Sequence, residues 1–243
     1  MNILIVSDIH ANLVALEAVL EDCGDFDALW NLGDTVGYGP RPSACLQRMR
    51  ELGANPMLTG NHDLASIGRL DDRDFNAVAR TAARWTSGQL SAEEKQLLAV
   101  LPSEAARDGF TLAHGSPRNP IWEYIASPLA AEENATFFAT NTCFVGHTHV
   151  ASCFALDAEG NCSGMDLLND GSTIDLTSSR YIINPGSVGQ PRDRDPRAAY
   201  GLLDTAQGVF TGRRVAYDVR KTQQQMEEAD LPAILIKRLE FGR

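Results

Sequence analysis

The sequence predicts an α/β protein, and three observations point to that class. Short apolar runs alternate with amphipathic stretches through the first 60 residues, in a β-α-β-α-β order that is typical of a parallel sheet with right-handed crossovers. After Pro102 short apolar runs are separated by turn residues, which predicts a strand-rich second half. Histidines and acidic residues directly follow several predicted strands, at the strand ends where parallel sheets bind ligands.

The elements of the first half follow from local patterns. Residues 2–6 are continuously apolar and rich in β-branched side chains, as expected of a buried strand. Asn12 is suited to cap a helix that continues through Asp22 with an apolar face. The chain then predicts a strand at 28–31, a loop rich in Gly and Pro, a helix at about 43–52, a strand at 56–59 and a mainly helical stretch at about 71–101.

The second half is predicted from turn residues and apolar runs. Strands are expected at 110–113, 143–145, 150–156, 173–176, 180–184, 198–204 and 209–216, with a helix near 128–138. A helical tail at about 221–239 is interrupted by Pro232. No linker separates these elements, so we expect one domain over residues 1–243, with 71–101 as a helical insert and 221–239 as a tail.

Charge and composition exclude several classes of protein. The 243 residues carry a net charge of −11, which disfavours binding to extended nucleic acid because phosphate contacts need clustered Lys and Arg. A small phosphate substrate remains compatible, since a bound metal can reverse the local field. The apolar N-terminal run is too short for a membrane span or a signal peptide, so no membrane association is expected.

The cysteines indicate a reducing compartment. There are five, an odd number, and none forms a CxxC pair, which argues against a thiolate zinc site and favours reduced cysteines in a cytoplasmic protein. The oligomeric state, monomer or homo-oligomer, is left open.

All five histidines fall in short motifs that suit metal ligation. These are Ser7-Asp8-Ile9-His10, Gly60-Asn61-His62-Asp63, Leu112-Ala113-His114-Gly115 and Gly146-His147-Thr148-His149. One such histidine alone is more often structural, Asp8 could merely cap a helix, and Asn61 could occupy a turn. Seven side chains nevertheless supply enough nitrogen and oxygen for two divalent ions that share a carboxylate: Asp8, His10, Asp34, Asn61, His114, His147 and His149. Such ligands favour Mn, Fe, Zn, Ni or Co, with Mn the first expectation.

In this order, the motifs resemble the signature of the calcineurin-like metallophosphoesterase superfamily. The resemblance runs from Met1 to about Tyr217, and residues 114–118 and 184–197 resemble its small prokaryotic phosphodiesterase branch. It implies an αββα four-layer sandwich, in which two mixed β-sheets pack face to face with helices outside. It also implies a binuclear-metal phosphodiesterase acting on a small or nucleotide-like ester by in-line attack of a metal-bridging hydroxide.

The resemblance implies a role for each matching residue. The first metal would be bound by Asp8, His10, Asp34 and His149, and the second by Asp34, Asn61, His114 and His147. Asp34 would bridge the two metals. His62 would be the catalytic residue that protonates the leaving group.

The substrate contacts are less well defined by the motifs. Arg118, Arg192 and Arg197, together with Asn61, are candidate contacts because guanidinium groups bind phosphate well. Acidic residues interleaved at 193 and 195 make a self-paired loop an equal alternative. Trp122 and Tyr124 could stack on a base or could simply pack.

Two departures from related branches separate this chain from protein phosphatases. Gly37 stands where those branches carry an Asp that orients the catalytic histidine, and Thr59 stands where they carry a substrate Arg. The orientation of His62 is therefore unexplained. Alternatives on the same site are a phosphomonoesterase or nucleotide pyrophosphatase, and, outside enzymes, a metal-binding scaffold or nucleotide sensor.

Overall fold

The central strand of the protein is buried on both of its faces. In this computed structural model, which describes residues 1–243, β1 (Asn2–Val6) points Ile3 and Ile5 into one apolar layer and Leu4 and Val6 into another. Alternate side chains of a strand face opposite ways, so a strand between two layers must be apolar throughout. This explains why β1 lacks the polar alternation of a half-exposed strand.

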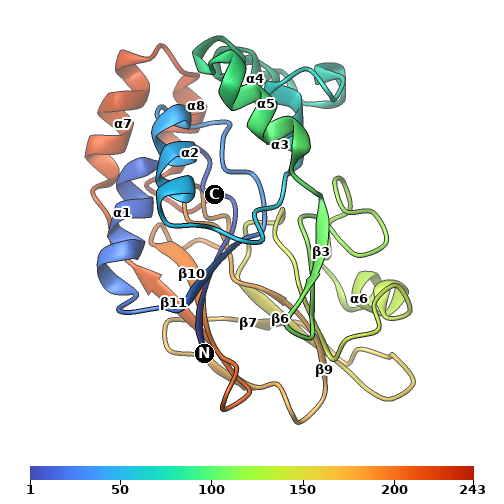
Figure 1. Cartoon of the computed structure of the whole chain (residues 1–243). Coiled ribbons are helices and arrows are strands. Elements are labelled where there is room, and N and C mark those ends of the chain that lie inside the picture. The colour runs from blue at the N-terminus through green and yellow to red at the C-terminus, as the bar shows by residue number, and fades with distance from the viewer.

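The first sheet has five strands in the order β2 (Ala28–Asn31), β1, β10 (Ala198–Asp204), β11 (Val209–Val215) and β8 (Thr173–Asp175). β1 pairs in parallel with β2 and antiparallel with β10, so the sheet is mixed. Helices α1 (Leu13–Asp22) and α2 (Pro42–Glu51) contribute Leu16 and Leu46 to the apolar layer on its outer face (Figure 1). Asn12 caps α1 by accepting a hydrogen bond from the Ala15 amide.

The second sheet has six strands in the order β3 (Glu104–Arg107), β4 (Phe110–Ala113), β5 (Thr142–Phe144), β9 (Arg180–Asn184), β6 (Ser152–Leu156) and β7 (Asp166–Leu167). Its outer face packs on α6 (Pro128–Asn134). Trp30, Phe144 and Phe210 fill the space between the two sheets. The four-layer αββα arrangement is thus confirmed.

The predicted strand at 56–59 is wrong. Only Met57 forms a bridge, with Asn31 of β2. Pro56 has no N–H to donate, and the Thr59 amide donates to the Pro102 carbonyl instead of to β2. The segment therefore follows β2 briefly and then turns away into α3 (Asn61–Ser66).

The helical insert and the helical tail pack against each other. The insert contains the short 3-10 helix η1 (Asp72–Asp74), α4 (Ala77–Gln89) and α5 (Ala92–Val100), and the tail contains α7 (Val219–Glu228) and α8 (Ala233–Arg238). Phe75 and Ala82 of the insert share one apolar cluster with Met226 and Leu235 of the tail. These helices gather at one end of the sandwich (Figure 1). None of the helices has the length and apolar character that a membrane span requires.

Candidate metal centre

Five of the seven predicted ligands lie on loops whose backbone is strained. Asp8, His10, Asp34, His147 and His149 all adopt positive φ angles, between 47° and 66°. Such conformations are rare for residues other than glycine, cost about 1–3 kcal/mol each and cluster at functional sites. Main-chain hydrogen bonds hold them, including 3.0 Å bonds from the Asp8 amide to the Gly33 carbonyl and from the His10 amide to the Asp34 carbonyl.

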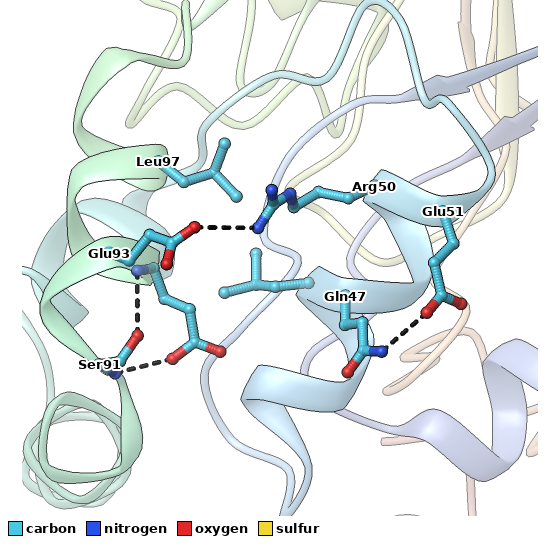
Figure 2. Close-up of a pocket in the computed structure, with 8 residues that line it drawn as sticks. Gln47, Arg50, Glu51, Ser91, Glu93 and Leu97 are labelled. Atoms are coloured by element: carbon cyan, nitrogen blue, oxygen red, sulfur yellow. Dashed lines mark hydrogen bonds and ion pairs between the residues drawn. The ribbon is translucent and has the colours of Figure 1, made fainter.

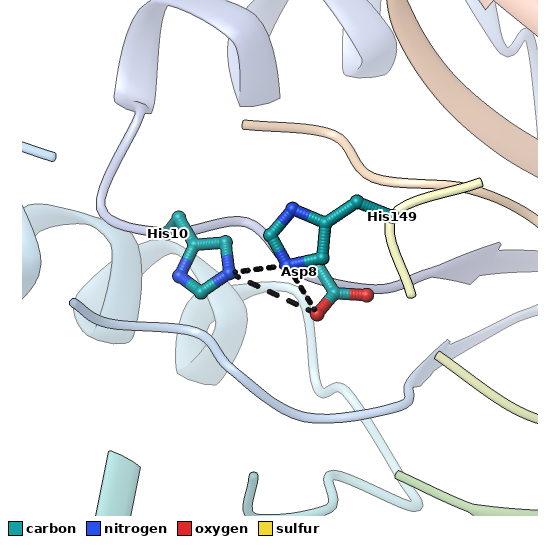
Figure 3. Close-up of side chains that lie close together, drawn as sticks. All are labelled: Asp8, His10 and His149. Atoms are coloured by element: carbon teal, nitrogen blue, oxygen red, sulfur yellow. Dashed lines mark hydrogen bonds and ion pairs between the residues drawn. The ribbon is translucent and has the colours of Figure 1, made fainter. Parts of the chain in front are cut away.

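The first cluster consists of Asp8, His10 and His149 (Figure 3). The two histidine Nε2 atoms lie 3.0 Å apart, and His149 Nε2 lies 3.3 Å from Asp8 Oδ1. The Nδ1 atoms of His10 and His149 face the carbonyls of Val36 (3.2 Å) and Gln190 (2.6 Å), which can only accept hydrogen bonds. Burial lowers the pKa of both imidazoles, so two Nε2 lone pairs meet at this point. A cation between them would remove the repulsion.

The second cluster consists of Asp34, His114 and His147. His114 Nε2 lies 3.4 Å from Asp34 Oδ2 and 3.3 Å from Asn61 Oδ1, and its Nδ1 faces the Leu32 carbonyl at 2.9 Å. Asp34 Oδ2 is also 3.7 Å from His10 Nε2 in the first cluster. Asp34 therefore contacts both clusters, as a bridging carboxylate must.

Three ligand atoms of the two clusters have no hydrogen-bond partner within the protein. Asp8 Oδ1, Asp34 Oδ2 and His147 Nε2 are buried and make no hydrogen bond. Buried polar atoms in native proteins normally have a hydrogen-bond partner. Three unpaired ligand atoms in neighbouring clusters therefore indicate that a cation binds there. Burial lowers the pKa of His147 to about 3, which leaves it neutral and able to bind metal. The residues thus fit two divalent ions with mixed nitrogen and oxygen ligands.

His62 stands beside the first cluster without a carboxylate to orient it. Its ring centroid lies 4.1 Å from that of Tyr38 and 5.0 Å from those of His10 and Phe75. Its amide donates to Asp34 Oδ1 at 2.8 Å. Its Nδ1 is buried and unpaired, and burial lowers its pKa to about 4. Aromatic packing and a main-chain hydrogen bond therefore orient His62 in this chain, in which Gly37 replaces the orienting Asp of related branches.

Gly37 makes that packing sterically feasible. A Cβ atom at position 37 would lie 2.8 Å from His62 Cβ and 3.0 Å from His62 Nδ1. The carboxyl of the neighbouring Asp63 accepts the amides of Val36 (2.9 Å) and Gly60 (3.0 Å), which joins this loop to the start of α3. Sequence patterns give no signal for Tyr38 or Phe75, because their contacts with His62 are made only in the folded chain.

We expect Gly37→Ala to lower turnover by up to about 10²-fold, because displacing a reacting group by about 1 Å has an effect of that size. The free energy of unfolding should also fall, by about 1 kcal/mol or more, since φ is +91°. Gly53→Ala is the matched control: φ is +67° and nothing lies within 4 Å of its Cβ, so stability alone should change. Steady-state kinetics and thermal unfolding measure both effects, and equal turnover in the two variants would contradict the expectation.

Of the three predicted substrate arginines, Arg192 is the one in contact with residues around the metal clusters. Its Nη2 donates to Gln190 Oε1 at 2.9 Å and to Tyr38 Oη at 3.4 Å, and its amide donates to the His149 carbonyl. Arg118 and Arg197 both have carboxylate partners. Arg118 pairs with Glu123 and Glu133. Arg197 pairs with Asp195 at 2.7 Å. Their substrate roles stay predictions.

A separate surface cavity of about 580 Å³ lies between α2 and α5 (Figure 2). Arg50 pairs with Glu93 across it at 3.6 Å, and Gln47 donates to Glu51 at 2.7 Å. Ser91 caps α5 on its rim. The polar side chains that line this cavity thus interact with one another, and none of them is a predicted metal ligand.

The αββα fold and the paired His/Asp clusters define a metallophosphoesterase-type protein. The model of the calcineurin-like phosphoesterase superfamily domain matches residues 1–208, so the chain belongs to that superfamily. Membership indicates a phosphoester hydrolase.

Similar proteins extend over the whole chain. A crystal structure of a metallophosphoesterase from Sphaerobacter thermophilus is 50% identical, with a TM-score of 0.91, and the match covers 100% of this chain and 99% of that one. An uncharacterized protein of Methanocaldococcus jannaschii is 34% identical over 99% of this chain and 98% of its own length. The fold also matches a hypothetical protein of Pyrococcus horikoshii at 20% identity and a TM-score of 0.79, covering 100% and 98% of the two chains.

Proposed function

We propose that this protein is a binuclear-metal phosphodiesterase that hydrolyses a small or nucleotide-like ester. Asp8, His10, Asp34 and His149 would hold the first metal. Asp34, Asn61, His114 and His147 would hold the second. The observation that carries the proposal is the shared carboxylate: Asp34 Oδ2 has no hydrogen bond and faces a histidine Nε2 in each cluster.

The catalytic chemistry divides between the metals and the protein. Two bound divalent ions would supply Lewis acidity and lower the pKa of water enough to provide a nucleophile near neutral pH. His62 would protonate the departing ester oxygen from Nε2, because its Nδ1 is buried against Gly37. Burial lowers the pKa of His62 to about 4, which favours the neutral imidazole, so His62 would act as the acid only when a bound phosphoester anion raises that pKa again.

Arg192 would bind a phosphoryl oxygen of the substrate. It has no carboxylate partner within 4.0 Å, and its buried Nε makes no hydrogen bond. The bonds of Nη2 to Gln190 and Tyr38 hold the guanidinium beside the clusters. A charged donor in this position suits an anionic substrate. Asn61 would be a further substrate contact.

The first test is hydrolysis of bis(p-nitrophenyl) phosphate by the Mn²⁺-loaded protein, beside chelated protein and beside p-nitrophenyl phosphate. We expect diester turnover to exceed monoester turnover and to fall by at least about 10³-fold on chelation, since a metal contributes several kcal/mol to transition-state stabilisation. Preference for the monoester would favour a phosphomonoesterase. No turnover with two bound metals per chain would favour a scaffold or a sensor.

Manganese and a cytoplasmic location belong to the same proposal. The ligand set without thiolates supports Mn among the metals considered. The five cysteines are free and buried, and burial raises their pKa values, which supports a reducing compartment.

A further inference from the structure

Tyr124 lies on a predicted metal ligand and is still half-exposed. Its ring stacks on that of His147, with centroids 4.0 Å apart and an interplanar angle of 14°. Tyr124 is 51% exposed, whereas His147 is 2% exposed. One face of the tyrosine therefore covers the imidazole, and much of the remaining ring is open to solvent beside the metal centre.

The segment between β4 and α6 holds this ring in place. Glu123, the neighbour of Tyr124, accepts hydrogen bonds from Ser116 Oγ (2.5 Å) and Asn134 Nδ2 (3.1 Å) and pairs with Arg118. Arg118 also pairs with Glu133 of α6 at 2.8 Å. The ion pair of Glu123 with Arg118 thus has a structural role and takes no part in the proposed catalytic chemistry. The hydrogen bonds tie Glu123, the residue before Tyr124, to Ser116 and to α6, so they anchor the segment that carries the exposed ring.

Tyr124 lies at the second cluster, on His147, and Arg192 lies at the first, where its amide donates to the His149 carbonyl. Arg192 in turn contacts Tyr38. The candidate centre is thus flanked by a guanidinium at the first cluster and by an aromatic ring at the second.

The two clusters differ in their relation to the predicted acid. His62 lies beside His10 of the first cluster, at 5.0 Å between ring centroids. Tyr124 lies on His147 of the second cluster. A leaving group must face His62 to receive its proton. A substrate that spans both clusters with its leaving group at His62 would present the retained ester group to the second cluster, where Tyr124 lies.

An aromatic ring with one free face favours a planar partner. Stacking of bases on protein aromatics is strong and tolerates any base, because every base has a π-face. A ring that merely shielded His147 would need no such exposure. We propose that Tyr124 is a stacking platform for a planar aromatic group, such as a nucleobase or an aryl ring, on the ester that stays attached to phosphorus. This inference rests on the proposed phosphodiesterase function.

Two diesters with one leaving group test the platform. Phenyl p-nitrophenyl phosphate and methyl p-nitrophenyl phosphate both release p-nitrophenolate, and only the first carries a planar retained group. We expect the wild-type protein to prefer the phenyl ester in kcat/KM, and Tyr124→Leu to reduce that preference by about tenfold. Tyr124→Phe keeps the ring and should keep the preference. If Tyr124→Leu lowers both rates equally, or loses metal, the ring only supports His147 and the proposal is overturned.

A binding experiment separates this inference from the proposed function. Calorimetry of phenyl phosphate and methyl phosphate with the Mn²⁺-loaded protein requires no turnover. We expect phenyl phosphate to bind about tenfold more tightly to the wild-type and Tyr124→Phe proteins, and the difference to disappear in Tyr124→Leu. If neither diester is hydrolysed but this difference is found, the phosphodiesterase proposal fails and the platform stands. If both phosphates bind alike in all three proteins, the platform is refuted.

Discussion

Replacing Asp34 with alanine is expected to remove both metals and to lower kcat/KM by at least about 10³-fold. Asp34 is the one carboxylate that lies near a histidine Nε2 atom of each cluster, at 3.7 Å from His10 Nε2 and 3.4 Å from His114 Nε2. Its loss takes a negative charge from both positions at once, and metal ions contribute several kcal/mol of charge stabilisation in such reactions. Each 1.36 kcal/mol corresponds to a factor of ten in rate. Metal content per chain and steady-state rates on the same protein samples measure the two effects.

Asp8→Ala is the matched control. Asp8 is just as buried, but its carboxylate lies in the first cluster, 3.3 Å from His149 Nε2. We expect it to lose one metal per chain, where Asp34→Ala loses two. Asp34→Asn keeps an oxygen that can accept the His62 amide and so separates loss of charge from loss of that bond. Retention of two metals by Asp34→Ala would refute a bridging role.

The residues of the two candidate metal clusters could be predicted because their signal is local. Each predicted ligand immediately follows an apolar run or belongs to a Gly-containing turn, and chain reversal after buried strands carries these side chains to one place. Asp8 and His10 follow β1, His114 follows β4 and His147 follows β5. The structure then joins the ends of strands from two sheets, which the ordered motifs implied only through the family resemblance.

The surroundings of the site could not be predicted because they depend on contacts between distant segments. Phe75 belongs to the helical insert, yet it packs on His62 and shares a cluster with Met226 of the tail. No pattern within either helical segment indicates the other as its partner. The ion pair of Arg118 with Glu123 likewise could not be predicted from the motif that suggested Arg118 as a phosphate ligand. Motifs therefore identified the side chains that gather in the two candidate metal clusters, while packing determines what surrounds them.

The segment at 56–59 shows how a local rule fails. Its apolar pattern is that of a strand, but pairing also requires donors and acceptors in register with a neighbour. Pro56 has no N–H, and the Thr59 amide finds the Pro102 carbonyl. Only the Met57 bridge remains. The error has no consequence for the site, because Asn61 and His62 are placed by the start of α3 and by the Asp34 carboxylate.

Replacing His62 with alanine is expected to lower kcat by about 10²–10⁴-fold while both metals remain bound. The ring of His62 belongs to neither metal cluster, and alanine retains the amide that donates to Asp34. The loss should grow as the leaving group becomes more basic, because a poor leaving group depends more on protonation. Thymidine 5′-phosphate esters of p-nitrophenol and of phenol, assayed with the wild-type and variant proteins, measure this dependence together with metal content.

Tyr38→Leu provides the control for packing. Tyr38 lies against the ring of His62 at 4.1 Å, so its removal loosens the imidazole without deleting the proton donor. We expect Tyr38→Leu to lower kcat less than His62→Ala does. It should slow the p-nitrophenyl and phenyl esters by similar factors. If His62→Ala slows both esters by the same factor, His62 does not protonate the leaving group and acts through binding or packing. If His62→Ala leaves turnover unchanged, another group is the acid, and the assignment carried by the Gly60-Asn61-His62-Asp63 motif fails for this chain.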